Sequence, residues 1–565
     1  MTDPKPAAPV PAPINASPAD SAGVTTGPAG VTSAPSSAAS GSTLEPLKHP
    51  VFRLLWGTWL VANTCMWMND VAAAWLMTSL TTSPVWVALV QTAATLPVFL
   101  LGLPSGALAD ILDRRRYFIF TQFWIAGVAL VLCAVILAGT MTPLLLLVLT
   151  FCNGIGLAMR WPVFSAVVPE LVPRAQLSAA LALNGIAMNA SRIIGPLVAG
   201  ALIASAGSVW VFVLNALLSV ACGLVIMRWE RVHVVSPLGR ERLLSAMRVG
   251  LQYVGQSARL RAVLLRIFLF FFHSTALMAL LPLVAQALPG GGSGAGTFTL
   301  LLASFGAGAI AAALFLPALR RALNSEARVQ LGTAVQAGAT AAVAFAPNVT
   351  VAALAMLVGG IAWIATANTL AVLAQLALPD WVRARGMSIY QMAVMGGSAA
   401  GAAIWGQTAA WSSVPASLAA AAVSGVVAMA LAGRLVRVRG AQEDLTPSNE
   451  FHVPVVDQAP HGGLIEMSVE YRIDPARADE FRALMQQSRR SRLRQGALSW
   501  ELLRDISDPG CYVEKIVDES WTEHLRRYDR VSAADVELRD RRREFHLGDK
   551  PPLVTRRVVD LAARA

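Results

Sequence analysis

One carboxylate stands well inside an apolar stretch of this sequence, namely Asp70 within residues 52–80. At helical spacing it shares a face with Asn63, Met66 and Trp67, so that face would be polar and aromatic. An ionisable group in the middle of an apolar helix costs roughly 2.5 to 3.5 kcal/mol on insertion scales, which makes it a candidate for function. We expect Asp70 to take up and release a proton, with Asn63 and Trp67 beside it to contact a ligand.

Basic side chains stand in three other apolar stretches, at Arg160, Arg192 and His273. A guanidinium stays protonated, so the two arginines can hold an anion or tune a carboxylate but cannot carry the proton themselves. An ion pair of Asp70 with Arg160 or Arg192, which would join helices without titrating, is the structural alternative. For His273 the alternatives are a hydrogen-bonded interior group and a proton relay.

The elements that carry these residues are twelve long apolar segments. Most have the roughly 20 residues that a helix needs to cross a hydrocarbon core of about 30 Å, and their length favours helices over barrel strands. The sequence therefore predicts an all-α polytopic membrane protein with twelve transmembrane helices in two six-helix halves. The predicted spans are 52–80, 85–109, 117–138, 143–168, 177–204, 209–227, 262–288, 297–319, 329–345, 350–376, 386–411 and 415–436.

Charge divides the connections between these spans into two alternating kinds. Six connections contain no Lys, Arg, Asp or Glu, whereas the others hold most of the arginines. By the positive-inside rule the charged connections are cytoplasmic, which also places both termini in the cytoplasm. Because this bias explains the net charge of +11, we expect a lipid bilayer as partner and no nucleic acid. The uncharged connections lie around residues 81–83, 139–142, 205–208, 289–296, 346–348 and 412–413.

Composition also changes outside the spans. The N-terminus is rich in Pro, Ala, Ser, Thr and Gly and should be disordered. The last hundred residues are hydrophilic and follow a β-α-β-β-α-β order, which predicts a small ferredoxin-like α+β domain in the cytosol. The predicted domains are a tail at 1–44, an N-terminal half at 45–228, a central cytoplasmic loop at 229–261, a C-terminal half at 262–440, a linker at 441–462 and the ferredoxin-like domain at 463–565.

Two helices should cover one face of the predicted sheet and leave the other face open. In its first strand, Ile465, Met467 and Val469 alternate with the polar residues Glu466 and Ser468. An apolar open face would be unusual for a monomer, so the pattern predicts a homodimer in which two sheets pair face to face. The predicted strands are 464–473, 497–506, 511–519 and 552–561, and the predicted helices are 476–493 and 521–545.

Residues 106–116 read GALADILDRRR, in which a Gly-x-Leu-Ala-Asp run precedes a basic cluster. This segment resembles the loop between the second and third spans of the major facilitator superfamily. The resemblance implies a gating loop in which Gly106 permits close helix approach and Asp110 ends a helix at the membrane surface. Arg114 and Arg115 would be partners for Asp110 or for a neighbouring helix end.

The loop departs from the common family form at two positions. Ile111 stands where a basic residue is usual, and Asp113 stands where glycine is usual. An ordinary turn with positive-inside arginines is the alternative interpretation of the segment.

A second resemblance lies in the predicted span 177–204, which contains the run RIIGPLVAG. Antiporters of the same superfamily carry a Gly-Pro followed by small residues here, which bends the helix and lets it approach the opposite half closely. The matching residues are Gly195, Pro196 and Gly200. A helix kinked for another reason would have the same pattern.

The architecture over residues 45–560 resembles the branch of the superfamily that includes the enterobactin exporter and the transmembrane secretion effectors. The resemblance implies a secondary active transporter that exports a small organic molecule across the bacterial cytoplasmic membrane, with proton antiport and alternating access; import would differ only in direction. No GxxxxGK[ST] loop is present, so ATP-driven export is not expected. The five cysteines form no CxxC, so we expect neither a metal nor a cofactor.

An alternative from another class assigns the chemistry to the C-terminal domain. This domain resembles the antibiotic-biosynthesis monooxygenase domains, some of which act without a cofactor, and it could be an enzyme or a ligand sensor. His524, His546, Trp500 and Tyr512 could line its pocket. No catalytic signature of that family can be matched residue by residue, so we do not expect an enzyme.

Overall fold

The structure is a computed structural model, in which residues 44–173, 176–229, 243–289, 294–379, 381–436, 443–448, 450–451, 460 and 462–559 are described. Nearly all of the expected N-terminal tail and most of the linker at 441–462 lie outside these residues.

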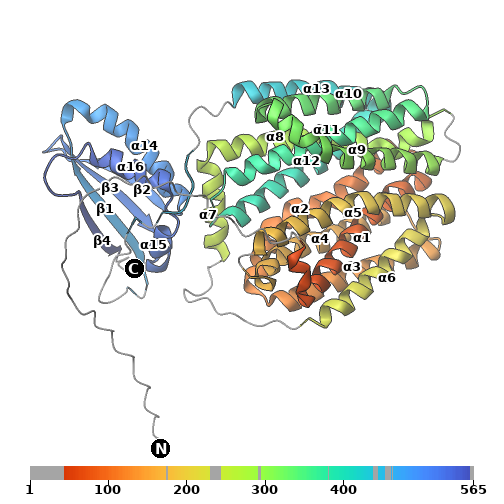
Figure 1. The fold of residues 1–565 in the computed structure, drawn as a ribbon, viewed down its shortest axis with the longest axis horizontal. Helices are drawn as coiled ribbons and strands as arrows, with labels where there is room; N and C mark the ends of the chain where they lie inside the picture. Colours follow the sequence, from red (N-terminus) through yellow and green to blue (C-terminus); the bar gives the residue numbers. More distant parts are fainter. Residues whose placement is uncertain are drawn as a thin grey trace, which may run out of the picture. The chain divides into compact units, whose positions relative to one another are not determined.

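After a short 3₁₀ turn, η1 (Glu45–Lys48), thirteen α-helices follow in the described part of residues 50–435 (Figure 1). Each of the twelve predicted spans corresponds to its own long helix, with four of them ending one residue beyond it, and the helical run in the central loop is the shorter α7. The helices are α1 (Pro50–Leu80), α2 (Pro84–Ile111), α3 (Arg114–Leu137), α4 (Pro143–Leu171), α5 (Leu177–Ala206), α6 (Ser208–Met227), α7 (Leu243–Gln256), α8 (Ala258–Ala287), α9 (Gly294–Ala322), α10 (Ser325–Ala344), α11 (Val349–Leu376), α12 (Arg383–Trp411) and α13 (Val414–Leu435).

Nine of the described helices are long and apolar enough to cross a membrane. The helices α1, α10 and α12 are outside that set. In α1 the polar residues Asn63, Asn69 and Asp70 lower the mean hydropathy of an otherwise apolar helix of 31 residues. Twelve spans therefore remain a prediction.

Local sequence explains where several helices begin. Pro143 follows Thr142, whose hydroxyl accepts a hydrogen bond from the backbone N–H of Leu145. At the start of α11, the Asn348 side chain accepts in the same way from Val351, at 3.0 Å. A polar N-cap satisfies one of the free N–H groups of a first turn, and a proline there removes another.

The helices α1–α6 and α8–α13 repeat one arrangement. In the first half α1 contacts α5 and α6, α2 contacts α4, and α3 contacts α4 and α6; the corresponding pairs recur among α8–α13. Between the halves, α2 lies against α12 and α5 against α9 (Figure 1). Such a pattern fits a parallel repeat of six helices.

The apolar core of this helical part is continuous at one end and divided at the other. At the end with uncharged connections, buried residues of both halves form one cluster that includes Met77, Leu281 and Phe298. Trp75 stacks on Phe298 with ring centroids 5.4 Å apart, and Gln286 donates a hydrogen bond to Thr78 at 2.8 Å.

At the end with charged connections, each half has a buried cluster of its own. One includes Phe52, Phe164 and Ile226, and the other includes Leu260 and Leu370. The apolar packing that joins the two halves is therefore concentrated at the uncharged end.

The C-terminal part holds a four-stranded antiparallel sheet with strand order β2-β3-β1-β4 (Figure 1). Buried side chains of β1, among them Met467, Val469 and Tyr471, form a core with Phe481 and Met485 of α14. The elements are β1 (Leu464–Arg472), η3 (Pro475–Arg477), α14 (Ala478–Arg494), β2 (Ser499–Arg504), β3 (Cys511–Asp518), α15 (Trp521–Tyr528), α16 (Ala533–Arg543) and β4 (Leu553–Val559).

The single helix predicted at 521–545 is wrong, because two helices occupy this segment. The first ends at Tyr528, with Asp529 as its C-cap, and Ser532 caps the second: its backbone N–H and hydroxyl both donate to Asp535, at 2.9 and 2.7 Å. This reciprocal capping box satisfies free donors at the start of α16 and favours a new helix over continuation of the old one.

The open face expected to pair in a homodimer is mixed rather than apolar, because the helices cover the face that carries Ile465, Met467 and Val469. The exposed Leu503 and Leu553 lie on the open face, together with charged residues. On the open face, Glu466 forms ion pairs with Lys515 at 3.0 Å and Arg557 at 3.4 Å, and Ser468 shares a hydrogen bond with Thr555. Burying such a face against a second sheet would require these charged groups to lose water, which opposes pairing.

Candidate functional site

Three polar side chains of α1 point into the helical part without full hydrogen bonding. Asn63 donates to the Trp59 carbonyl at 2.7 Å, but its side-chain oxygen has no partner among the described residues. The buried indole N–H of Trp67 and one buried carboxylate oxygen of Asp70 also have no hydrogen-bond partner among the described residues. Buried polar atoms of this kind are costly unless a ligand, water or proton compensates them.

Arg192 of α5 connects this face of α1 to the other half. Its guanidinium lies over the ring of Trp67 and over the ring of Trp363 from α11, with a centroid distance of 5.3 Å in each case. Cation–π contacts stabilise a desolvated guanidinium without a carboxylate. We call Asn63, Trp67, Asp70, Arg192 and Trp363 the interior cluster.

Sequence reasoning missed Trp363. The signal in the sequence was an indole in the middle of the predicted span 350–376, because a buried indole N–H usually has a hydrogen-bond partner. Pattern alone does not show which helix of the second half faces α5.

Arg160 has a structural environment. Only 1% of the residue is exposed, both terminal nitrogens donate to the Ala62 carbonyl at 3.4 Å, and the guanidinium lies 5.4 Å from the Trp59 ring. No ion pair joins Asp70 to Arg160 or Arg192 in the described part of the chain. The expected structural alternative, a salt bridge to Asp70, is therefore absent in this conformation. The two arginines instead contact tryptophan rings and, for Arg160, a backbone carbonyl, and the Nε–H of each has no hydrogen-bond partner among the described residues.

His273 of α8 lies outside the interior cluster. Its Nδ1 is 2.7 Å from the Leu269 carbonyl, and its ring lines a small pocket with Gln336 and Thr340 of α10. Arg266, which shares its helix face, pairs with Glu326 at 2.6 Å. This environment corresponds to the hydrogen-bonded interior histidine of the two expected alternatives.

The gating loop is described in part. The side chains of Gly106 and Asp110 are outside the described set. Asp113, one of the two departures from the family form, is the N-cap of α3 and accepts from the backbone of Arg116 at 2.9 Å. Arg115 donates to the carbonyls of Met227, at 2.6 Å, and Trp229, so it caps the end of α6, where a cation is favourable.

The two glycines of the second motif lie at contacts of α5. A methyl group on Gly195 would collide with Trp67 of α1, and one on Gly200 would collide with Thr299 of α9, in the other half. Pro196 lies inside α5, which continues to Ala206. The motif therefore allows close approach both within the first half and across to the second.

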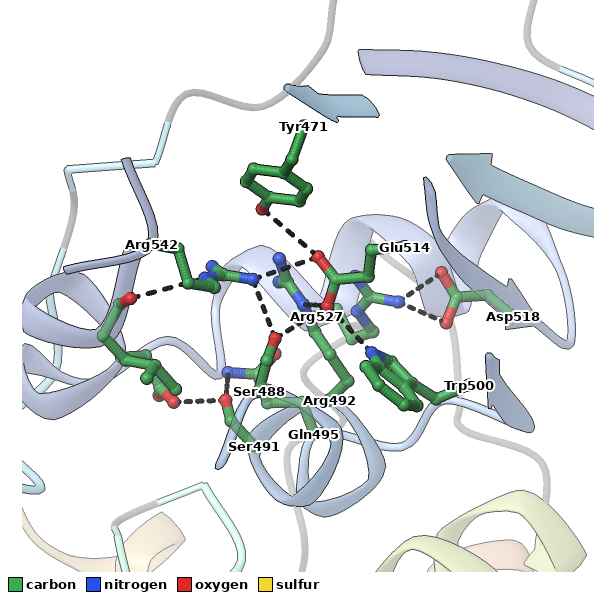
Figure 2. A network of polar contacts seen from close by, with 12 residues as sticks. Tyr471, Ser488, Ser491, Arg492, Gln495, Trp500, Glu514, Asp518, Arg527 and Arg542 are labelled. Carbon is green, nitrogen blue, oxygen red and sulfur yellow. Dashed lines mark hydrogen bonds and ion pairs between the residues drawn. The ribbon is translucent and has the colours of Figure 1, made fainter. Parts of the chain in front are cut away.

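The four residues expected to line a pocket in the C-terminal part do not do so. Trp500 donates to Glu514 at 2.8 Å (Figure 2), and His524 is fully buried with Nδ1 2.7 Å from Asp518. Burial lowers the pKa of His524 although the Asp518 carboxylate raises it, and its Nε2 lies where it accepts a hydrogen bond from Arg556, as a neutral ring does. Tyr512 is buried, and His546 accepts from the backbone of Arg472 at 3.0 Å. The polar groups of Trp500, His524 and His546 are thus used within the fold, whereas the buried Tyr512 hydroxyl has no hydrogen-bond partner among the described residues. None of the four is among the residues that line the cavity of this part.

Residues 41–565 match the family of transmembrane secretion effectors. The chain is 27% identical over 243 residues to macrolide efflux protein A of Streptococcus pyogenes, which is 42% of this chain and 58% of that protein. It is 25% identical over 139 residues to the staphyloferrin A transporter of Staphylococcus aureus (strain NCTC 8325 / PS 47), covering 24% and 35% of the two chains. These matches span between about a third and three fifths of the relatives' own length.

Among solved structures, a bacterial homologue of the human lysosomal transporter Spinster, in an inward-facing and occupied conformation, is similar with a TM-score of 0.56. The identity is 14%, over 70% of this chain and 99% of the other. The nucleoside transporter NupG gives a TM-score of 0.54 at 12% identity, over 69% and 100%. At this identity the likeness shows the fold alone.

Proposed function

The chain belongs to the transmembrane secretion effector family of major facilitator superfamily transporters, and from this membership we propose that it exports a small amphiphilic organic molecule in exchange for protons. It is a multi-pass membrane transporter with efflux and siderophore transporters among its relatives. The observation that carries the proposal is the interior cluster. In it, Asp70 has no ion pair and lies one helical turn from Trp67, and Arg192 lies over both Trp67 and Trp363 of the other half.

Asp70 is the proposed proton carrier. A carboxylate held by a salt bridge would stay charged throughout a cycle, whereas one with an unpartnered buried oxygen can alternate between its charged and neutral forms as its surroundings change. Arg192, which keeps its charge, is proposed to position the substrate or its acidic group. Trp67 and Trp363 supply apolar and aromatic contact area for an amphiphilic molecule.

Alternating access is proposed to occur by rocking of the two halves. The apolar core joins the halves at the uncharged end and is separate at the charged end. If the charged connections are cytoplasmic, as the positive-inside rule implies, this conformation is open to the cytoplasm. Twelve spans, cytoplasmic termini and a bacterial cytoplasmic membrane belong to this proposal.

The C-terminal part is proposed to be a ferredoxin-like domain, which its strand order and its helix-covered face support. We assign it a binding role, because none of the aromatic and histidine side chains considered for catalysis lines its cavity. The homodimer stays a prediction that light scattering of the detergent-solubilised protein tests.

The test uses inside-out vesicles that contain wild type or the Asp70→Asn variant. Labelled macrolide and siderophore are offered with and without a pH gradient, and exchange against internal unlabelled substrate is measured in parallel. We expect the variant to lose gradient-driven uptake and to keep exchange, since exchange requires no net proton movement. Undiminished gradient-driven uptake would exclude Asp70 as the carrier, and loss of both activities with normal yield would indicate a substrate-binding role instead.

A further inference from the structure

The covered face of the C-terminal sheet borders a pocket of about 290 Å³. One wall is apolar and consists of Met467 and Val469 of β1, Val554 of β4 and Phe451. The volume is near the lower end of small-molecule sites, which range over roughly 300 to 1,000 Å³ and usually combine apolar walls with a few polar groups.

The opposite wall is basic. Among the described residues, six arginines and a single carboxylate, that of Glu450, line the pocket. In a globular domain such a cluster of like charges is destabilising unless counter-ions or a ligand compensate it. The six are Arg492, Arg527, Arg539, Arg542, Arg543 and Arg556.

Four of these arginines have carboxylate partners. Arg542 and Arg492 lie 3.0 and 3.5 Å from Glu514, and Arg527 lies 2.8 Å from Asp518 (Figure 2). The fourth arginine, Arg539, pairs with Glu450 at 2.9 Å.

The other two arginines, Arg543 and Arg556, have no carboxylate within ion-pair distance in the described part of the chain, although Asp540 interacts with Arg543 at longer range. Arg556 instead donates to the His524 ring at 3.2 Å and to the Tyr528 hydroxyl at 2.8 Å. Arg527, whose side chain is only 4% exposed, also has a buried Nε–H without a hydrogen-bond acceptor. Among the described residues, the wall thus offers guanidinium groups without an ion-pair partner and an unused donor.

We propose that this pocket binds a small organic acid, with its carboxylate at Arg556 and Arg543 and its apolar body on Met467, Val469 and Val554. A guanidinium presents paired donors that match a carboxylate. Inorganic phosphate would fit the charge but would leave the apolar wall without a partner, so the two walls together select an acid with an apolar body.

The test is isothermal titration of the full-length protein in nanodiscs. Three probes separate charge from shape: 2-naphthoate, its neutral isostere 2-naphthamide, and inorganic phosphate. We expect binding of the naphthoate and at least tenfold weaker binding of the other two. The Arg556→Gln variant should bind naphthoate roughly tenfold or more weakly, since it loses a charged hydrogen bond.

The matched control is Arg557→Gln, the next residue on β4, which lies on the open face of the sheet and pairs with Glu466. It should bind naphthoate like wild type. Should Arg556→Gln fail to fold, Arg543→Gln takes its place, because that side chain is exposed. Equal affinities of the pocket and control variants, equal binding of naphthamide, or tighter binding of phosphate would overturn the proposal.

Discussion

Replacing Glu514 with glutamine should destabilise the C-terminal part strongly. The carboxylate is fully buried and contacts Arg542, Ser488 and Trp500 at 3.0, 2.7 and 2.8 Å (Figure 2). Glutamine keeps the shape and can accept one or two of these hydrogen bonds. It cannot neutralise Arg542 and Arg492, whose side chains are 4% and 12% exposed.

Two arguments give the size of the expected loss of stability in Glu514→Gln. Removing one partner of a buried ion pair typically costs about 3 to 5 kcal/mol, because the other charge stays buried. Burial alone would raise the pKa of Glu514, but Arg542, Arg492 and hydrogen bonds from Trp500 and Ser488 outweigh it and lower the pKa from 4.5 to about 2. That difference corresponds to about 3 kcal/mol at neutral pH.

Hydrogen exchange of the full-length protein in nanodiscs measures this loss locally. Amides of β3 and α14 should exchange roughly a hundredfold faster in Glu514→Gln, whereas Glu501→Gln, an exposed carboxylate on the adjacent strand, should change them little. Because the folded-state pKa is depressed, the stabilisation is complete above about pH 4.5 and is lost as the pH falls toward 2. The wild-type advantage should therefore be constant between about pH 5 and pH 8.

Similar exchange in the two glutamine variants would refute the reasoning, since it would mean that water or backbone groups compensate the arginines. An advantage that grows between about pH 7 and pH 4 would refute it too, because the sign of the pKa change would then be opposite.

Three further predictions concern the helical part. Gly200→Val should lower transport, and it should lower the free energy of unfolding in detergent by about 1 to 3 kcal/mol, because the new side chain collides with Thr299. The control Gly127→Val, with open space around it, should be near neutral. Equal effects of the two variants would contradict close packing of α5 against α9. Arg192→Lys keeps the charge but loses the planar stacking, so gradient-driven uptake should fall at least tenfold at unchanged yield; full activity would mean that charge alone suffices. Reporter fusions at positions 139 and 207 should give an outside signal and one at position 113 an inside signal, and the reverse pattern would invert the topology.

Helix positions could be predicted because the signals are local. Run length, prolines and N-cap residues such as Thr142 determine where an apolar helix starts, so each predicted span matches its own helix to within a few residues at either end. The break between α15 and α16 was equally local, and the Ser532-x-x-Asp535 spacing of a capping box was its overlooked signal. Departures from a family motif also carry information, since Asp113 supplies the cap of α3.

Contacts between helices could not be predicted in the same way. The alternation in β1 separates an apolar from a polar face but does not state which one the helices cover. Likewise, Trp363 is one of several indoles in apolar spans, and only the arrangement of α5 against the second half brings it to Arg192. Such contacts depend on helix rotation and register, which a single sequence without aligned relatives does not specify.

The two parts of the chain satisfy buried arginines in different ways, and the difference bears on how each would work. In the C-terminal part, Arg527 and Arg542 are fixed by the carboxylates Asp518 and Glu514, so those acids stay charged. In the helical part, Arg192 lies over two tryptophan rings and pairs with no carboxylate in the described part of the chain. An arginine that does not require a carboxylate leaves Asp70 able to lose its charge without leaving a buried cation unpaired. The proposed proton carrier needs this separation, whereas a domain that only binds a ligand, as proposed for the C-terminal part, does not.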